Sequence, residues 1–259
     1  MRVIILCGGM GTRLREETEY KPKPMVEVGG KPILWHIMKT YSNYGYNDFI
    51  LALGYKGSMI RDYFLNYSFY NTDCKIEMGN QNRITFFEKN TEGWNVSLIN
   101  TGDESMTGYR LKLCGKYIDT EEFMLTYGDA VSDVNIPELV KFHRKQGTIG
   151  TVTGVYPPSR FGDLESDGYL VKNFKEKIVN LENKYPINGG YFVFKKSFLD
   201  LIPDDPNCDL EKEPMNKLTS INQLSFFKHG GYWQCMDTYR DYLMLNKQWE
   251  ENPLWKVWE

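Results

Sequence analysis

The chain has 259 residues, of which 41% are hydrophobic and 15% aromatic, so it is long enough to bury a sizeable core. Its 31 lysines and arginines nearly balance 34 acidic residues, which gives a net charge of −3. The charges are spread along the chain without a basic stripe, so we expect no nucleic-acid partner. The sequence shows neither an apolar stretch near the roughly 20 residues of a membrane span nor a secretory signal. We therefore expect a soluble, cytoplasmic protein with no membrane partner.

The cysteines point to the same compartment. The chain has five, an odd number, and they are widely spaced and form no C-x-x-C pair. This pattern argues against a disulfide framework and against a zinc cluster. A reducing cytosol fits it best.

Short apolar segments alternate with helical patterns at the start of the chain. Val3–Cys7 is continuously apolar, which is typical of a strand buried on both faces. Lys31–Tyr44 is expected to be a helix with Pro32 in its first turn, because apolar residues recur there at helical spacing. Phe49–Leu53 is a second strand, and a second helix is expected through residues 60–64. This β-α-β-α order predicts an α/β fold with a doubly wound, mostly parallel sheet, whose ligands bind at the carboxyl ends of the strands.

The rest of the chain has less regular patterns but continues the alternation. We see no repeat, low-complexity tract or linker, and therefore predict one α/β domain, residues 1–259, with β-rich insertions. The expected elements are strands at Ile84–Phe87 and Val96–Ile99, a helix at Thr107–Tyr117, a strand at Phe123–Tyr127, a helix at Pro137–Gln146, a strand at Ile149–Tyr156, a hairpin turn at Asp167–Gly168, a strand at Gly190–Phe194 and a helix at Asp241–Trp249.

A glycine-rich turn follows the first strand, in LCGGMGTRL at residues 6–14. Glycines allow backbone N–H groups to approach an anionic ligand, because no Cβ holds the ligand away. The turn is not a Walker A motif, and Leu14 stands where the dinucleotide fingerprint needs its last glycine. A tight strand-to-helix turn without any ligand is the alternative.

Two cations near this turn favour a phosphate ligand. Arg13 lies within it, and Lys23 lies in KPKP at residues 21–24, where the prolines restrict the backbone. Two cations beside one group of N–H donors repel each other unless an anion lies between them. Lys21 is interpreted as a possible solvated neighbour.

These motifs resemble the signature of the sugar-1-phosphate nucleotidylyltransferases. The similarity runs nearly end to end: LCGGMGTRL is followed by KPKPMVEVGGKPILWHIM, GYKG, TYGDAVSD, RFGDL, FKEK and INGGYFVF in the family's order. WNVSLINTGDESMTGYRL and WQCMDTYRD are similar to blocks of the cytidylyl branch. The resemblance implies a Rossmann-like nucleotidyltransferase fold, and CTP and a sugar 1-phosphate, here glucose 1-phosphate, as substrates. CDP-glucose and pyrophosphate would be the products; another NTP or another phosphorylated acceptor is the alternative.

The resemblance also implies roles for individual residues. The catalytic residues would be Arg13, Lys23 and Asp129, and Asp129 and Asp237 would bind Mg²⁺, which prefers carboxylate oxygens and bridges phosphates. The sugar would contact Gly162, Glu176, Lys177, Asn188 and Gly189. The nucleotide would contact Leu6, Cys7, Gly8, Gly9, Met10, Gly11, Thr12, Arg13, Lys23, Glu104, Tyr109 and Gly128.

Several of these residues have a structural alternative. Asp129 could cap a turn and Asp237 could cap the last helix. Asn188 could belong to a plain turn, and Glu176 and Lys177 could form an exposed ion pair worth roughly 0–1 kcal/mol. Cys7 is interpreted as a small buried apolar residue rather than a nucleophile. The three histidines, His36, His143 and His229, lack ligand spacing and are interpreted as packing or surface residues.

The chain departs from the family pattern at three positions. Glu104 and Tyr109 stand in the stretch that resembles the cytidine-contacting loop, where smaller side chains are expected. Ile178 stands where relatives commonly have proline. We therefore expect the nucleotide side of the site to follow the family more closely than the sugar side.

Two functions from other classes stay open at this point. A non-catalytic nucleotide-binding module would not need Lys23, Asp129 and Asp237 together. A glycosyltransferase would be expected to have an Asp-x-Asp pair, whereas residues 126–129 offer a single acid. The resemblance implies an oligomer, so we expect a homo-oligomer. The aromatic C-terminus, residues 252–259, is apolar enough to cover a neighbouring subunit or the chain's own core.

Overall fold

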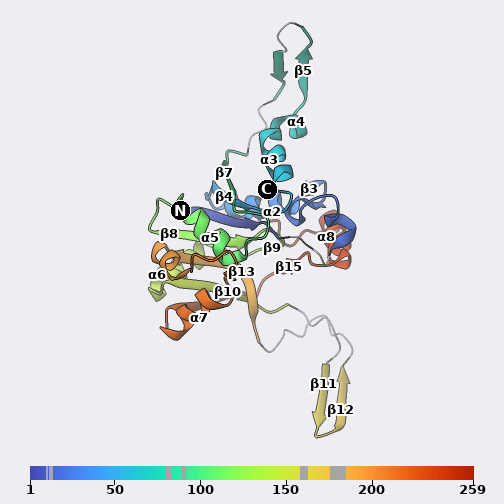
Figure 1. Ribbon diagram of the computed structural model, residues 1–259. Coiled ribbons are helices and arrows are strands. Elements are labelled where there is room, and N and C mark those ends of the chain that lie inside the picture. Colours follow the sequence, from blue (N-terminus) through green and yellow to red (C-terminus); the bar gives the residue numbers. More distant parts are fainter. Residues whose placement is uncertain (10, 12–13, 80–82, 89–91, 158–162, 176–184) are drawn as a thin grey trace.

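The computed structural model describes residues 1–9, 11, 14–79, 83–88, 92–157, 163–175 and 185–259. At its centre lies a seven-stranded sheet in the order β14-β10-β13-β8-β1-β4-β7 (Figure 1). The strands are β1 (Arg2–Cys7), β4 (Asp48–Leu53), β7 (Asn95–Asn100), β8 (Glu122–Tyr127), β10 (Gly150–Val155), β13 (Ile187–Lys195) and β14 (Leu224–Lys228).

The sheet is mostly parallel, as predicted. β1 pairs in parallel with β4 and β8, β4 with β7, and β10 with β14. Only β13 runs against its two neighbours, β8 and β10. The carboxyl ends of the other strands therefore lie along one edge, where an α/β sheet binds its ligands.

Helices cover both faces of the sheet, which confirms the doubly wound architecture. In β1, Val3, Ile5 and Cys7 belong to one hydrophobic core, and Ile4 and Leu6 to the other. This two-sided burial explains why the strand is apolar throughout. The first core contains residues of α2 (Ile33–Asn43), α3 (Gly57–Leu65), α6 (Ile136–Gln146) and α8 (Tyr239–Glu251); the second contains residues of α5 (Thr107–Gly115), η2 (Lys196–Leu201) and α7 (Glu213–Ser220).

Short elements complete the edge at the carboxyl ends. The helix expected to begin at Lys31 begins instead at Ile33, because Lys31 and Pro32 pair with Glu27 and Val28 in a small ribbon. Pro32 therefore precedes the first turn. The short elements are α1 (Arg15–Thr18), η1 (Lys23–Met25), β2 (Glu27–Val28), β3 (Lys31–Pro32), α4 (Tyr67–Asn71), β9 (Ala130–Ser132) and β15 (Trp233–Cys235).

Two hairpins form the predicted β-rich insertions. In Figure 1 they extend from the body in opposite directions, and we call them the first arm, β5 (Cys74–Glu77) with β6 (Arg83–Phe86), and the second arm, β11 (Asp163–Asp167) with β12 (Leu170–Lys175). The turn of the second arm contains Gly168 at φ +59°, which confirms the hairpin expected there. Both arms expose apolar side chains: Met78 is 81% exposed and Leu170 77%.

The aromatic C-terminus packs on its own chain. Trp255 is fully buried and Trp258 is 8% exposed in the first core, so of the two locations expected for this segment the structure has the second. No helix in the described part of the chain has the length and apolarity that crossing a membrane requires.

Candidate active site

The glycine turn forms one wall of a cavity at the carboxyl edge of the sheet. The cavity has a volume of about 260 Å³ and lies between the ends of β1 and β8, η1 and the start of α5. Its lining brings together eight of the predicted residues, from three distant parts of the sequence. They are Leu6, Cys7, Gly8, Gly9, Gly11, Lys23, Gly128 and Asp129, joined by Pro24, Thr107, Arg110 and Tyr127.

The close packing of other side chains against the turn explains some of its glycines. A Cβ on Gly8 would lie 2.2 Å from Cζ of Arg110, so this position is closed by the protein's own guanidinium. Gly11 has φ +62°, and a Cβ there would lie 2.8 Å from Cγ2 of Thr18. A Cβ on Gly9 would meet no atom of the described residues within 4 Å, so they leave the turn open to a ligand at this position.

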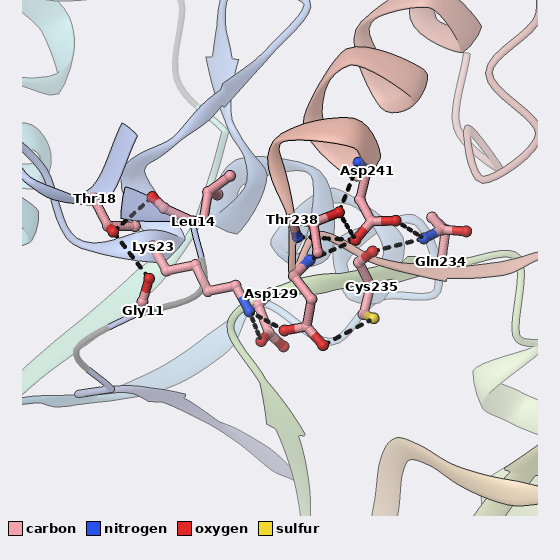
Figure 2. A network of polar contacts seen from close by, with 10 residues as sticks. Gly11, Leu14, Thr18, Lys23, Asp129, Gln234, Cys235, Thr238 and Asp241 are labelled. Atoms are coloured by element: carbon pink, nitrogen blue, oxygen red, sulfur yellow. Dashed lines mark hydrogen bonds and ion pairs between the residues drawn. The ribbon is translucent and has the colours of Figure 1, made fainter. Parts of the chain in front are cut away.

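Lys23 lies between two carboxylates, as Figure 2 shows. Its Nζ is 2.7 Å from Oδ2 of Asp129 and 2.6 Å from Oδ1 of Asp237. The lysine side chain is only 12% exposed. Burial lowers the pKa of this ammonium, but the attraction of Asp129, followed by that of Asp237, outweighs burial and raises the pKa above its ordinary value. Lys23 is therefore charged at neutral pH.

The two aspartates reach this point from different elements. Asp129 follows β8, and its carbonyl accepts a hydrogen bond from the N–H of Met236. Asp237 lies just before α8, but it is not the cap of that helix. Thr238 is the N-cap: its hydroxyl accepts from the N–H of Asp241, whose carboxylate accepts from the N–H groups of Thr238 and Asp237 (Figure 2). The capping alternative for Asp237 is therefore wrong, and the capping box holds its backbone at the site.

The carboxylates of Asp129 and Asp237 lie close together, because both contact the ammonium of Lys23. Within the described residues, no group of three or more His, Cys, Asp or Glu side chains is arranged to hold a metal ion. A pair of carboxylates is nevertheless what Mg²⁺ takes from a protein when substrate phosphates and water supply its other ligands. The donor set thus fits Mg²⁺ bound together with a nucleotide, and does not fit a closed structural metal site.

A second polar group borders the cavity on the side of β13. The Asn188 amide donates to the hydroxyl of Tyr127 at 3.2 Å, and this hydroxyl donates to Glu211. Glu211 also accepts from Thr107 at 3.0 Å. Gly189 is held beside it, since its carbonyl accepts from the indole of Trp233 at 2.7 Å. Asn188 is therefore more than part of a plain turn, because its side chain is tied to a residue that lines the cavity.

Two predicted nucleotide contacts lie elsewhere. Glu104 is exposed and borders a neighbouring hollow with Gly102, Ser105 and Asn207. Tyr109 packs against the second hydrophobic core. Neither side chain lines the cavity. Met10, Thr12, Arg13, Gly162, Glu176, Lys177 and Ile178 lie outside the described residues.

The sequence interpretation missed Arg110, Tyr127 and Glu211. A signal existed for Arg110: it is four residues before the buried Cys114 on α5, so the helix period places a charged residue on the apolar face. Tyr127 and Glu211 had no such signal, since a tyrosine ending a strand and an acid in a loop are ordinary.

The remaining reactive side chains are structural. Burial raises the pKa of the Cys7 thiol, which confirms its interpretation as a buried apolar residue. Ser132, His229 and Asp133 lie together, but the same Nε2 of His229 contacts both Ser132, at 3.2 Å, and Asp133, at 3.0 Å. A proton relay needs the two ring nitrogens to have different partners, so this is not a catalytic triad.

Comparisons with known proteins show the family of this chain. Residues 2–252 match the Nucleotidyl transferase family. The chain is 48% identical over 261 residues to the glucose-1-phosphate cytidylyltransferase of Salmonella typhi and 39% identical over 259 residues to the probable glucose-1-phosphate cytidylyltransferase of Bacillus subtilis, with both chains fully covered in each comparison. The crystal structure of HddC from Yersinia pseudotuberculosis has the same fold, with a TM-score of 0.69 at 24% identity over 96% of this chain and 99% of that one. The family match and the full-length identities show that this chain belongs to the nucleotidyl transferase family.

Proposed function

We propose that the chain is a glucose-1-phosphate cytidylyltransferase, which converts CTP and α-D-glucose 1-phosphate to CDP-glucose and pyrophosphate. The observation that carries this proposal is the pairing of Lys23 with Asp129 and Asp237 beside an open glycine turn. The choice of CTP and glucose 1-phosphate is supported by the full-length similarity to relatives of that name.

The reaction needs no covalent enzyme intermediate. A phosphate oxygen of the sugar phosphate attacks the α-phosphorus of CTP, the bond from that phosphorus to the bridging oxygen of the β-phosphate breaks, and pyrophosphate leaves with the electron pair. Catalysis then consists of holding two anions in line and stabilising the charge that grows between them.

The residues of the cavity match these tasks. The backbone of the glycine turn binds the nucleotide, together with Arg13. Before the substrates bind, the Lys23 ammonium is paired with the two aspartates. When the reacting phosphates enter, this ammonium also contacts their oxygens. Asp129 and Asp237 would hold Mg²⁺, and a bound Mg²⁺ would supply positive charge beside the phosphates. Asn188 and Gly189 orient the sugar, with Gly162, Glu176 and Lys177.

A matrix of four NTPs against several phosphorylated acceptors tests this function, with pyrophosphate release as the readout. We expect the fastest release from CTP with glucose 1-phosphate and Mg²⁺, and CDP-glucose as the product by mass. Faster turnover of another pair would assign the enzyme to that pair. No release from any pair would favour a regulatory nucleotide-binding module. Transfer of the sugar from a supplied nucleotide-sugar to an acceptor, with release of a nucleoside diphosphate, would favour a glycosyltransferase.

We further propose that the protein is a homo-oligomer whose contacts involve the two arms. A two-stranded hairpin is at best marginally stable by itself in water. Both arms nevertheless expose apolar side chains, including Phe87 at 67% and Leu170 at 77%. A neighbouring subunit would cover these side chains, and the C-terminal tryptophans are already used within the chain.

Light scattering of the full chain tests the assembly. We expect a mass of at least two chains at micromolar concentration, and a lower mass for Phe87→Ser with Leu170→Ser. Ser substitution at Leu254, which is 51% exposed in the C-terminal segment, is the control and should leave the mass unchanged. A monomeric wild type would contradict the proposal.

A further inference from the structure

Glu211 is an acid held beside the nucleotide cavity without lining it. It lies in the loop before α7, and two of its partners, Thr107 and Tyr127, line the cavity. Oε2 of Glu211 accepts from the hydroxyl of Thr107 at 3.0 Å, and Oε1 accepts from the hydroxyl of Tyr127. Both carboxylate oxygens are therefore used as acceptors, and they join the first residue of α5 to the last residue of β8.

The loop that carries Glu211 is fixed to the start of α5 by other hydrogen bonds. The N–H of Gly108 donates to the carbonyl of Cys208 at 3.0 Å, and the N–H of Leu210 donates to the hydroxyl of Thr107 at 2.9 Å. Neither bond uses the Glu211 carboxylate. We therefore expect the loop to stay in place when that carboxylate is removed.

The phenol of Tyr127 is held between Glu211 and Asn188. A Cβ on Gly190 would lie 2.5 Å from Cδ2 of the ring, and the ring packs edge-on against Phe192 at a centroid distance of 5.8 Å. Burial, followed by the charge of Glu211, raises the pKa of the Tyr127 phenol, which therefore keeps its proton at neutral pH. The hydroxyl donates this proton to Glu211, and its oxygen accepts from the Asn188 amide at 3.2 Å.

The amide of Asn188 is oriented at both ends. Its Oδ1 accepts from the N–H of Gly190 at 2.9 Å, and its Nδ2 donates to the hydroxyl of Tyr127 at 3.2 Å. A backbone N–H can only donate, so the amide oxygen has to face Gly190 and the nitrogen then faces Tyr127. An amide nitrogen has two N–H groups, and Asn188 is exposed, so the second N–H can donate to a ligand.

We propose that Glu211 is a positioning residue for the sugar phosphate: by accepting a hydrogen bond from Tyr127, it makes the phenol oxygen an acceptor that orients Asn188 toward the sugar. This inference rests on the proposed nucleotidyl transfer and on the sugar contact proposed for Asn188. Without the carboxylate, the phenol hydroxyl can rotate toward the amide N–H and release it. The sugar phosphate then has to order Asn188 itself, and that cost appears as weaker binding of the sugar phosphate.

Glu211→Met tests the role of the carboxylate, because it removes the acceptor and keeps a side chain of similar length. We expect the KM for the sugar phosphate to rise roughly three- to tenfold, the scale of one hydrogen bond, with the KM for the nucleotide within about twofold of wild type. Glu211→Gln is the conservative rescue, since its Oε1 still accepts from Tyr127, and it should keep the wild-type KM for the sugar phosphate. A wild-type KM in Glu211→Met, or equal impairment in Glu211→Gln, would overturn the proposal.

Tyr127→Phe tests whether Glu211 acts through the phenol. It removes the hydroxyl and keeps the ring, so the KM for the sugar phosphate should rise as in Glu211→Met. Both variants break the same chain of hydrogen bonds, so adding Glu211→Met to Tyr127→Phe should have no further effect. If Glu211 only held its loop to α5, the two effects would multiply, and that result would overturn the proposal. An unchanged KM in Tyr127→Phe would do so even if Glu211→Met does not fold.

Glu213→Met is the matched control for Glu211→Met. Glu213 lies two residues further along the chain, and its exposed carboxylate pairs with Lys217 on α7 at 2.8 Å. The control removes the same charge, and both KM values should stay as in the wild type. An equal rise in the KM for the sugar phosphate would assign the effect to net charge and overturn the positioning role.

The wild-type control separates this proposal from the proposed function. All variants are assayed with the nucleotide and acceptor that the wild type turns over fastest. If the wild type turns over none, the proposed function fails, and Glu211 is then judged by the Kd for glucose 1-phosphate from calorimetry. A Kd weaker by about threefold or more in Glu211→Met would still support the positioning role. An equal Kd, or no binding of glucose 1-phosphate by the wild type, would overturn it.

Discussion

The positive charge of Lys23 is balanced by two carboxylates before any substrate binds. Two neighbouring carboxylates repel each other unless a cation lies between them, and in the structure the Lys23 ammonium lies between Asp129 and Asp237. One positive and two negative charges leave a net charge of about −1 at this point. A dication entering with the nucleotide would therefore be attracted, and Lys23 would then be free to contact phosphate oxygen.

Replacing Lys23 by Met should disable catalysis. The reacting phosphates would lose one stabilising charge, so we expect kcat/KM to fall by roughly 10²-fold or more, the scale for removing one such group. Pyrophosphate release measures this. Lys21→Met is the control, because Lys21 pairs with Glu27 at 3.1 Å outside the cavity, and its activity should stay within a few-fold of wild type. Comparable activity of the two variants would show that Lys23 takes no part in catalysis.

Replacing Asp237 by Asn should have two separable effects. Magnesium-dependent pyrophosphate release should be lost, because one of the two carboxylates is gone. If the two carboxylates only repelled each other, the variant would be at least as stable as the wild type without metal. In the structure, however, Lys23 loses one of its two partners while Asp129 stays. We expect a loss on the order of 1 kcal/mol by chemical denaturation.

Asp133→Asn is the control for Asp237→Asn. Asp133 also lies near this edge, but its partner is His229 and it does not line the cavity. It should retain turnover. An Asp237→Asn enzyme as active as this control would rule out the two-carboxylate metal site.

The role of a single residue could be predicted where the residue stands in a short sequence motif. The glycine turn, Lys23 and Asp129 stand in short motifs, and the structure brings them into one cavity. Glu211 and Tyr127 meet only after the chain folds, through a hydrogen bond between residues 84 positions apart. No local pattern records such a contact, so it could not be predicted.

At the scale of elements, several strands of the central sheet were predicted. β1, β4 and β8 are continuously apolar because both of their faces are covered, and their bounds matched within one residue. The edge strand β7 also matched within one residue, whereas β14, at the other edge, was not expected. The short pair β9 and β15 joins residues about a hundred positions apart, and three residues give no periodicity to detect.

The arms illustrate a different limit. The turn of the second arm was predicted from Asp167-Gly168, because turn chemistry is local. The exposure of the arms was not, because apolar strand residues ordinarily indicate burial against the same chain. Ile76, Ile84 and Val171 are instead about half exposed, at 49%, 43% and 55%. In the proposed oligomer a neighbouring subunit would cover such residues, and a contact of that kind leaves no local pattern in the sequence of one chain.

At the scale of the whole molecule, an aromatic cluster ties the C-terminus to the N-terminal third of the chain. His36 of α2 is fully buried among Trp35, Trp249, Trp255 and Trp258. Its Nε2 donates to the carbonyl of Val28 at 2.8 Å, and its Nδ1 accepts from the indole N–H of Trp255 at 3.4 Å. Both ring nitrogens are thus satisfied in the neutral form. Protonation would place a second N–H against the indole donor.

This cluster should make the stability of the protein depend on pH. Burial lowers the pKa of His36 from 6.5 to about 4, although hydrogen bonds to the backbone of Val28 and Lys31 act in the opposite direction. As the pH falls below 6.5, the unfolded chain binds a proton at this residue and the folded chain does not, so the free energy of unfolding decreases until the pH reaches about 4. The difference amounts to at most roughly 3 kcal/mol.

Urea denaturation between pH 7 and pH 4.5 measures this difference in the free energy of unfolding. His36→Gln keeps an amide donor and acceptor but does not titrate, and His143, whose pKa burial also lowers, is present in both proteins. The wild type should therefore lose more stability on acidification than His36→Gln, whereas parallel pH profiles would show that His36 is protonated in the folded protein at its ordinary pKa.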